Sequence, residues 1–269
     1  MLSSLQSEKK RRELNEKLIK YTLILAAAIS ILTTFGILFS ILFEAIEFFQ
    51  LRSFWYFLTG TIWSPGVANS QFGALPIFAG TFVITIIALL VAIPIGLGSA
   101  IYMSEYASPK FRDYLKPILE ILAGIPTVVY GFFAAITVAP LVVKAAAFFG
   151  LEATFNSALA SGIVMGIMII PLISSLSDDV IRAVPDSQRK AAFALGMTHG
   201  ETIKNIVIPS AMPGIISASL LALSRALGET MIVVMAAGLR PNLSWNPLED
   251  MTTVTVTIVN SLVGDFEFN

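Results

Sequence analysis

The sequence contains no cysteine and a single histidine, His199, among its 269 residues. Disulfide bonds, thiolate catalysis and cysteine-ligated metals are therefore excluded, and so is a metal centre built from several histidines. Charged residues are also scarce, at 13% of the chain, whereas soluble domains carry roughly 25%. A soluble protein of this length needs a larger polar surface, so the deficit of charge indicates a membrane protein.

Long runs without a charge take the place of that polar surface. They are Tyr21–Phe43, Ser53–Ser104, Ile121–Val143, Ala153–Ser177 and Asn205–Ser224. Each reaches the roughly 20 residues that a helix needs to cross a bilayer. The runs are continuously apolar and do not alternate, which argues against a transmembrane β-barrel. We therefore predict an all-α, polytopic helical membrane protein with five spans, at about residues 20–43, 76–103, 118–142, 155–177 and 210–237.

Lys and Arg residues gather on one side of these spans. All but four of the 17 basic residues precede the first span, lie between spans two and three, or lie between spans four and five. The other four are Arg52, Lys144, Arg225 and Arg240. Cytoplasmic loops are enriched in Lys and Arg, so we predict a cytoplasmic N-terminus. The predicted parts are an N-terminal helix with the first span (1–50), an extracytoplasmic or interfacial segment (51–75), and a transmembrane core (76–269) with a cytoplasmic loop (178–209).

The C-terminal region contains one more uncharged stretch, Thr252–Gly264. It is too short to cross a bilayer. We expect it to begin a helix or to lie at the membrane interface. With five spans, the C-terminus would lie outside the cytoplasm.

The loop 178–209 has the pattern of a helical hairpin. Small residues such as Ala191 and Ala192 let one helix face approach another backbone closely, and Gly196 permits a sharp turn. Apolar residues then recur at helical spacing, which indicates a second helix with a buried face; they are Ile203, Ile206 and Val207.

This segment resembles the EAA loop of ABC importer permeases. The family pattern is Glu-Ala-Ala, three residues, Gly, nine residues, Ile, one residue, then an apolar residue and Pro. The matching residues here are Ala191, Ala192, Gly196, Ile206, Ile208 and Pro209, and Lys190 stands where glutamate is usual. The resemblance implies that the first helix of the loop sits in a groove of a separate ATPase and follows its closure. A loop that merely connects two spans is the alternative.

A charged pair, Arg225 and Glu229, interrupts the fifth predicted span. A central charge costs roughly 2.5–3.5 kcal/mol on insertion scales, so such residues usually face a polar interior or a pathway. Four residues apart, the two are predicted to share a helix face and to pair. An arginine fork can bind a tetrahedral oxyanion through two hydrogen bonds, with Thr230 as a further donor and Glu229 as orienter or gate. A salt bridge that only fixes helix packing is the alternative.

The stretch from Arg225 to Met231 resembles the signature of the PstC family of phosphate importer permeases. Other segments similar to that family are Phe72–Pro76, Pro94–Gly98, Ser104–Ala107 and Leu122–Gly131. The resemblance covers about residues 55–240 and implies a type I ABC importer permease fold that translocates inorganic phosphate across the cytoplasmic (inner) membrane. Members usually have a sixth span, so we expect one to be missing from the C-terminus of this sequence.

The same resemblance implies the partners. They are a homologous PstA-like permease, two PstB-like ATP-binding subunits and an extracytoplasmic PstS-like phosphate-binding protein, all acting in a lipid bilayer. No Gly-x-x-x-x-Gly-Lys-Ser/Thr motif occurs, so the chain is not itself the ATPase. We expect no enzymatic activity, no cofactor, no metal and no nucleic acid partner.

Two other functions remain open at this point. One is a permease of the same architecture for another oxyanion, such as sulfate or molybdate. The other is a secondary transporter that needs no ATPase. Two smaller predictions concern packing: Gly162 and Gly166 form a small-residue face for close helix contact, with the sister permease as the expected partner, and His199 is expected to be a surface residue.

Overall fold

The computed structural model describes residues 2–66 and 70–263, and the side chains of residues 15–66 and 70–262. The chain divides into two units, Met1–Tyr56 and Phe57–Asn269. Two features used above lie outside the described residues. They are the side chains of Lys9–Arg12, which contribute to the predicted cytoplasmic N-terminus, and Gly264, which ends the predicted C-terminal stretch.

The first unit is dominated by one helix, α1 (Leu2–Leu51). Its candidate span, Asn15–Leu51, is longer at both ends than the predicted span 20–43. The helix continues beyond the apolar run because glutamate is a good helix former and the segment after Phe43 contains two glutamates among apolar residues. A second, short helix, α2 (Phe54–Thr59), begins in this unit and ends in the next.

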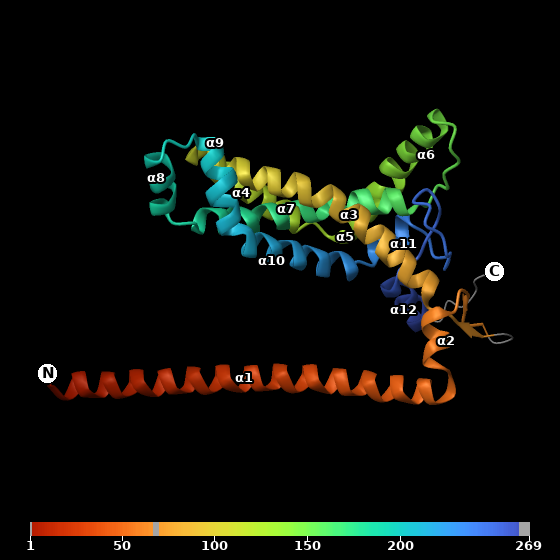
Figure 1. The fold of residues 1–269 in the computed structure, drawn as a ribbon. Coiled ribbons are helices and arrows are strands. Elements are labelled where there is room, and N and C mark those ends of the chain that lie inside the picture. The colour runs from red at the N-terminus through yellow and green to blue at the C-terminus, as the bar shows by residue number, and fades with distance from the viewer. Residues whose placement is uncertain (1, 67–69, 264–269) are drawn as a thin grey trace. The chain divides into compact units, whose positions relative to one another are not determined.

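The described part of the second unit is mostly helical and contains one small strand pair (Figure 1). The strands are β1 (Trp63–Ser64) and β2 (Gln71–Phe72), and they pair antiparallel. The helices are α3 (Leu75–Ile101), α4 (Pro109–Ala123), α5 (Thr127–Phe133), α6 (Ala139–Phe148), α7 (Ala158–Ala183), α8 (Asp186–Ala194), α9 (His199–Thr202), α10 (Ile208–Leu227), α11 (Met231–Ala236) and α12 (Val254–Val263), with π-helical turns η1 (Tyr102–Tyr106), η2 (Ala134–Val138) and η3 (Ile203–Val207).

Within the described residues, five helical segments are long and apolar enough to cross a membrane, as predicted. The second, Leu75–Tyr106, extends a few residues beyond the predicted 76–103. The fourth, Ala158–Ala183, runs past the predicted end at Ser177. It continues because the Asp178 and Asp179 side chains form ion pairs with Arg112 and Lys116 of α4, at 2.8 and 2.7 Å.

The predicted third span, 118–142, is wrong in its position. The chain breaks at Gly124–Pro126, between α4 and α5, and the candidate span is Thr127–Phe148. Proline disfavours a helical residue before it, so Pro126 begins the helix after it and does not lie within the span. The preceding helix α4 carries five charged residues among its apolar ones.

The predicted fifth span, 210–237, is also displaced. Its helical segment runs from His199 to Leu227 through α9, η3 and α10, and then breaks. A separate short helix, α11, follows the break. Thr252–Gly264 was expected to begin a helix or lie at an interface, and α12 starts within it at Val254.

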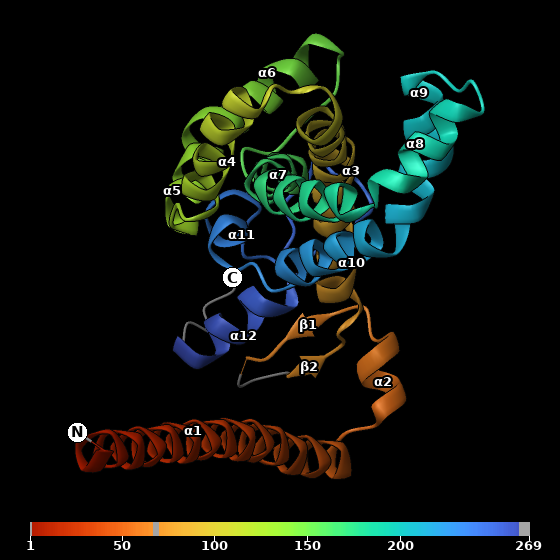
Figure 2. The ribbon, with the colours of Figure 1, turned by 90° about the vertical axis from the view of Figure 1, so that its left-hand side faces the viewer.

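Helix α7 is the centre of the second unit (Figure 2). It contacts α3, α4, α5, α6, α10 and α11. A Cβ added at Gly162 would lie 2.7 Å from the Ile87 Cβ, and one at Gly166 would lie 2.8 Å from the Ala88 carbonyl oxygen. The small-residue face therefore packs against α3 of the same chain, and its predicted contact with a sister permease is wrong.

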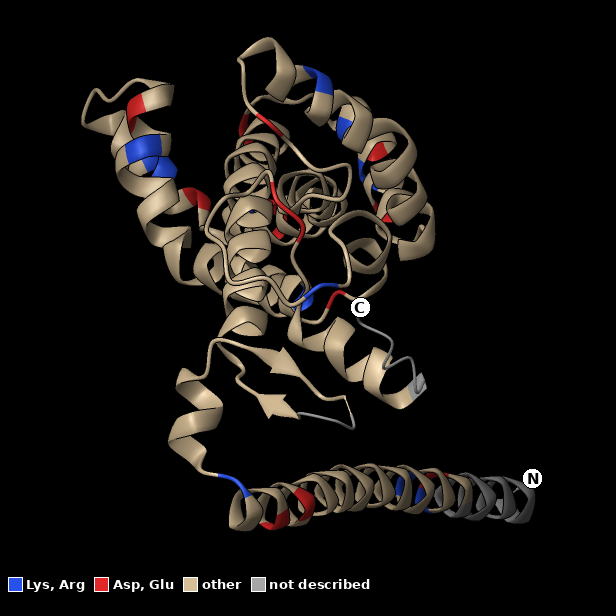
Figure 3. Ribbon diagram, turned by 90° about the vertical axis from the view of Figure 1, so that its right-hand side faces the viewer, with Lys and Arg blue, Asp and Glu red and all other residues tan. Residues whose placement is uncertain are grey.

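Charged residues are distributed unevenly in the second unit (Figure 3). Helix α3 carries none over its 27 residues, whereas α4 and α8 carry several. The long helices of the core are thus mostly apolar, and the charged residues lie at their ends and at the breaks between them.

Candidate functional site

The predicted helical hairpin is present and compact. Helix α8 ends at Ala194, and Gly196 follows with φ +81°, a left-handed conformation that favours glycine. Helix α9 then begins with a capping box, in which Thr198 and Glu201 each bond the other's backbone amide. Together α8, the turn and α9 form a hairpin, Asp186–Thr202, which we name the coupling hairpin after the role that the resemblance implies.

Most of the residues that carry the EAA resemblance meet in one groove of about 560 Å³. Its walls come from α8, from the turn between α8 and α9, and from the segment after α9. The lining residues are Gln188, Ala191, Ala192, Leu195, Met197, Asn205, Ile206, Pro209 and Ser210. Gly196 forms the turn beside the groove, and Lys190 is exposed and outside its lining. The alanines of α8 and Ile206 thus lie on one surface.

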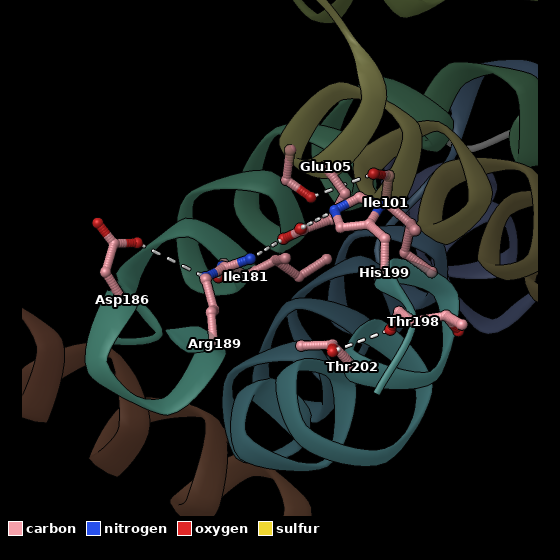
Figure 4. Close-up of polar contacts among 9 residues, drawn as sticks. Ile101, Glu105, Ile181, Asp186, Arg189, Thr198, His199 and Thr202 are labelled. Carbon is pink, nitrogen blue, oxygen red and sulfur yellow. Dashed lines mark hydrogen bonds and ion pairs between the residues drawn. The ribbon is translucent and has the colours of Figure 1, made fainter. Parts of the chain in front are cut away.

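The coupling hairpin is attached to the end of α3 by a partly buried ion pair (Figure 4). The Arg189 guanidinium donates to the Glu105 carboxylate in η1 at 2.5 Å and to the Ile181 carbonyl at 3.0 Å. The His199 Nε2 lies 3.7 Å from the other Glu105 oxygen. His199 also contacts the rings of Tyr106 and Phe193, but its side chain is 46% exposed, as expected of a surface residue.

The predicted pairing of Arg225 with Glu229 is wrong. Helix α10 ends at Leu227, so the two residues do not share a helix face. The buried Glu229 carboxylate instead accepts hydrogen bonds from the amides of Met231 and Ile232, at 3.0 and 3.3 Å. It therefore caps the start of α11. Over residues 15–66 and 70–262, Arg225 has no ion-pair partner.

Two chain breaks meet near Arg225. At the first break the Tyr130 hydroxyl, from α5, donates to the Leu122 carbonyl of α4 at 2.9 Å. Arg225, at the second break, lies within electrostatic range of that same hydroxyl. Helices α5 and α11 contact each other there, and a Cβ added at Gly131 would lie 2.6 Å from the Met235 sulfur.

The side chain of Arg225 is exposed in the isolated chain. It belongs to an uncovered face of α10 whose members follow helical spacing. They are Ile216, Ser217, Leu220, Leu221, Ser224 and Arg225. Thr230 is half-buried at the N-cap of α11, and within the described part of the chain its hydroxyl forms no hydrogen bond. Thr230 thus lies at the break beside Arg225, but its hydroxyl has no hydrogen-bond partner among the described residues.

Sequence reasoning assigned no role to Glu105 or Tyr130. Both lie within segments that carry the family resemblance, Ser104–Ala107 and Leu122–Gly131. A lone carboxylate directly after an apolar span was the available signal for Glu105. The break between α4 and α5, which places Tyr130 near Arg225, could not be found from periodicity. The uncharged run Ile121–Val143 continues through it.

Residues 92–258 match the family described as "binding-protein-dependent transport system inner membrane component". That segment covers more than half of the chain and includes both the coupling hairpin and Arg225. The chain belongs to this family. With the five candidate spans, membership confirms the predicted fold class, an all-α multi-pass membrane protein of the importer permease family.

Individual relatives of known name are similar to this chain over longer stretches than the family match. The chain is 37% identical over 202 residues to a probable ABC transporter permease, YqgH, of Bacillus subtilis, covering 75% of this chain and 64% of that relative. It is 34% identical over 262 residues to the phosphate transport system permease protein PstC of Mesorhizobium japonicum, covering 89% of this chain and 78% of the relative.

Among solved structures, this chain is similar in fold to a chain of the MetNI methionine ABC transporter in an inward-facing conformation. The match covers 72% of this chain and 88% of the other, at 19% identity and a TM-score of 0.47.

Proposed function

We propose that this chain is a transmembrane permease subunit of an ATP-driven importer that translocates inorganic phosphate. The observation that carries the proposal is its likeness to proteins named phosphate transport system permease protein PstC. In three of these relatives, identity is 30–34% over 77–91% of this chain. The isolated arginine at a helix break supports it, because a guanidinium fork suits a tetrahedral oxyanion.

The position of Arg225 sharpens the proposed path. Its face of α10 carries small polar and apolar residues and is left uncovered by the chain itself. A charge facing lipid would be costly, so this face requires another protein surface. We therefore place phosphate passage between α10 of this chain and a homologous permease subunit, with Arg225 and Tyr130 on this side.

The role of Glu229 changes in this proposal. It was expected to orient Arg225 or to act as a gate, but its carboxylate is held by two backbone amides. Glu229 fixes the start of α11 and thereby the shape of the break. Arg225, unpaired within the described chain, is left available for an anion. Thr230 remains a candidate donor at the edge of the path.

The groove beside α8 supports an ATPase partner. A mostly apolar groove beside the hairpin, at the end of the bundle, is suited to receive side chains of another subunit. We propose that two ATP-binding subunits engage this chain and its homologue through their hairpins. Lys190, exposed beside the groove, would meet an acidic or polar group rather than the partner of a glutamate.

The distribution of basic residues orients the chain in this proposal. The coupling hairpin and the N-terminus lie in the cytoplasm, and the segment 51–75 lies outside. The membrane is the cytoplasmic one. An extracytoplasmic phosphate-binding protein would deliver its ligand to the opposite end of the bundle from the hairpin.

Uptake by the reconstituted complex tests the substrate. Proteoliposomes containing this chain, its permease partner, the ATPases and the binding protein should accumulate radiolabelled phosphate when ATP is supplied. Excess unlabelled phosphate should compete, whereas sulfate and molybdate should not. Competition by sulfate or molybdate but not by phosphate would assign the chain to another oxyanion.

Omitting the ATPase subunits provides the control for the mechanism. Uptake should then stop. Uptake that continues without ATPases, driven by an ion gradient, would show a secondary transporter and contradict the proposal.

A further inference from the structure

One buried carboxylate contacts both helices of the coupling hairpin. The Glu105 side chain is only 4% exposed, although it lies beyond the end of an apolar span. One of its oxygens accepts from Arg189 on α8, and the other faces His199 on α9. Figure 4 shows the carboxylate between these two side chains. Any rotation of the hairpin about the end of α3 must therefore disturb this contact.

The chain itself does not join the hairpin to α3 directly. Helices α4, α5, α6 and α7 lie between them in the sequence, so the covalent neighbours of the hairpin are α7 and α10. The hydrogen bond from Arg189 to the Ile181 carbonyl links the hairpin to α7, to which the chain already joins it. The contact of Arg189 with Glu105 is different, because it ties the hairpin to a span that the chain reaches only through four other helices.

The local backbone is consistent with a functional contact. Glu105 lies in η1, a single π-helical turn, and a second one, η3, follows α9. Such turns are less regular than an α-helix and often occur at functional sites. The ion pair thus joins segments that each lie beside an irregular helical turn.

The other end of α3 leads to the break beside Arg225. The Thr81 hydroxyl accepts from the Val254 amide at 3.1 Å, and the Thr255 hydroxyl donates to the Glu229 carbonyl at 2.9 Å. With a rise of about 1.5 Å per residue, α3 spans about 40 Å. The hairpin and α12 lie near opposite ends of this helix (Figure 1). A shift of α3 along its axis would therefore reach the residues that shape the break.

We propose that Glu105 is a positioning residue for energy coupling. It makes α3 follow the coupling hairpin, so that a hairpin displaced by its ATPase moves α3 and, through Thr81 and Thr255, the break beside Arg225. This inference rests on the proposed ATP-driven function. A purely structural ion pair is the alternative, since a buried pair is in itself weak grounds for a large contribution to stability.

The first test replaces the charge and keeps the shape. In the complete reconstituted complex, Glu105→Gln should leave subunit assembly and basal ATP hydrolysis within about twofold of wild type. Phosphate uptake and its stimulation of hydrolysis, per assembled complex, should fall by about tenfold, in the upper part of the range measured for coupling residues. The matched control is Glu120→Gln, which removes an exposed carboxylate from α4 and should change neither. Unchanged uptake in Glu105→Gln, loss of assembly, or an equal loss in the control overturns the proposal.

A second test needs no transport, and the absence of cysteine in this chain makes it direct. Spin labels at Ser187→Cys on α8 and Leu90→Cys on α3, both exposed positions, report the distance between hairpin and span in the complex with cysteine-free partners. Adding ATP with a hydrolysis-deficient ATPase should leave this distance unchanged when Glu105 is present and should change it in Glu105→Gln. A distance that changes equally in both proteins overturns the proposal, as does one that changes in neither. If the wild-type complex fails to take up phosphate, the proposed substrate is wrong, but this distance still decides the role of Glu105.

Discussion

Arg225 and Glu229 show how a helix break redirects side chains that a continuous helix would pair. Within a helix, residues four apart face each other, but α10 ends between these two at Leu227. The carboxylate then satisfies the free amides of the next helix, and the guanidinium remains open to the uncovered face of α10. The two charges thus have separate tasks, and each can be tested alone.

For Arg225 we predict loss of transport without loss of assembly. Hydrogen bonds to a charged group contribute about 1.5–3 kcal/mol, so Arg225→Ala should reduce phosphate uptake by about a hundredfold. Arg225→Lys keeps the charge without the planar fork and should retain part of the activity. Uptake per assembled complex is the measurement. A complex that falls apart in Arg225→Ala would instead indicate a packing role.

For Glu229 we predict a loss of stability that depends on its acceptor atoms. Glu229→Ala leaves buried amides at Met231 and Ile232 without their partner and should destabilise the chain by about 1–2 kcal/mol. Glu229→Gln keeps a carbonyl acceptor and should cost less. Thermal unfolding in detergent measures both. Equal destabilisation by the two variants would show that the negative charge, rather than the cap, is what matters.

At the scale of single elements, the coupling hairpin is the part whose geometry the sequence indicated best. Gly196 was expected to form a turn and has a positive φ, which an L-residue with a side chain adopts at a cost. The alanines and Ile206 line one groove, and their role in docking stays a prediction. The turn could be predicted because the conformational freedom of glycine is a local property.

Replacing Gly196 should therefore weaken the ATPase contact. Gly196→Val forces a β-branched residue to φ +81° and should cost about 1–2 kcal/mol, reducing the affinity of the ATPase for the permease by roughly tenfold. Gly196→Asn is the matched control, because asparagine tolerates this conformation better. The dissociation constant of the ATPase from the reconstituted permease is the measurement. Equal affinities of the two variants would exclude the turn from docking.

The spans were harder to delimit than the hairpin. Hydropathy gave the number of candidate spans correctly, because charge is excluded from the bilayer core wherever the helices begin and end. It misplaced two of them. The uncharged run Ile121–Val143 continues through the break at Gly124–Pro126. At Gly228–Thr230 the chain breaks where Arg225 and Glu229 were expected to pair within one continuous helix. The contact of Glu105 with Arg189 was also beyond reach, since it joins residues 84 positions apart that no local pattern relates.

On the scale of the whole chain, the contact of α3 with α7 holds the second unit together. Most of the largest buried side chains, among them Ile84, Met165, Ile169 and Ile173, belong to one hydrophobic cluster to which both helices contribute. The glycines of α7 bring the backbones close, as small residues do between membrane helices. What the sequence suggested as an interface between subunits is therefore part of the core.

This packing predicts opposite outcomes for two similar substitutions. Gly166→Ala places a methyl group 2.8 Å from the Ala88 carbonyl oxygen and should destabilise the chain by about 1–3 kcal/mol. Gly98→Ala, on α3, meets nothing within 4 Å and should be neutral or stabilise by up to about 1 kcal/mol. Melting temperatures of the purified variants in detergent compare them. A neutral Gly166→Ala would mean that α3 and α7 are farther apart in the membrane.

The uncovered face of α10 has a genetic consequence. If the cavity for the anion is completed only when a second permease covers Arg225, residues encoded by two genes together determine which anion it accepts. Exchanging one gene alone between species would change one wall of the cavity and so its fit to the other wall. A variant that loses transport could then be rescued by a change in the other gene. Pairs of such genes are therefore expected to be inherited together.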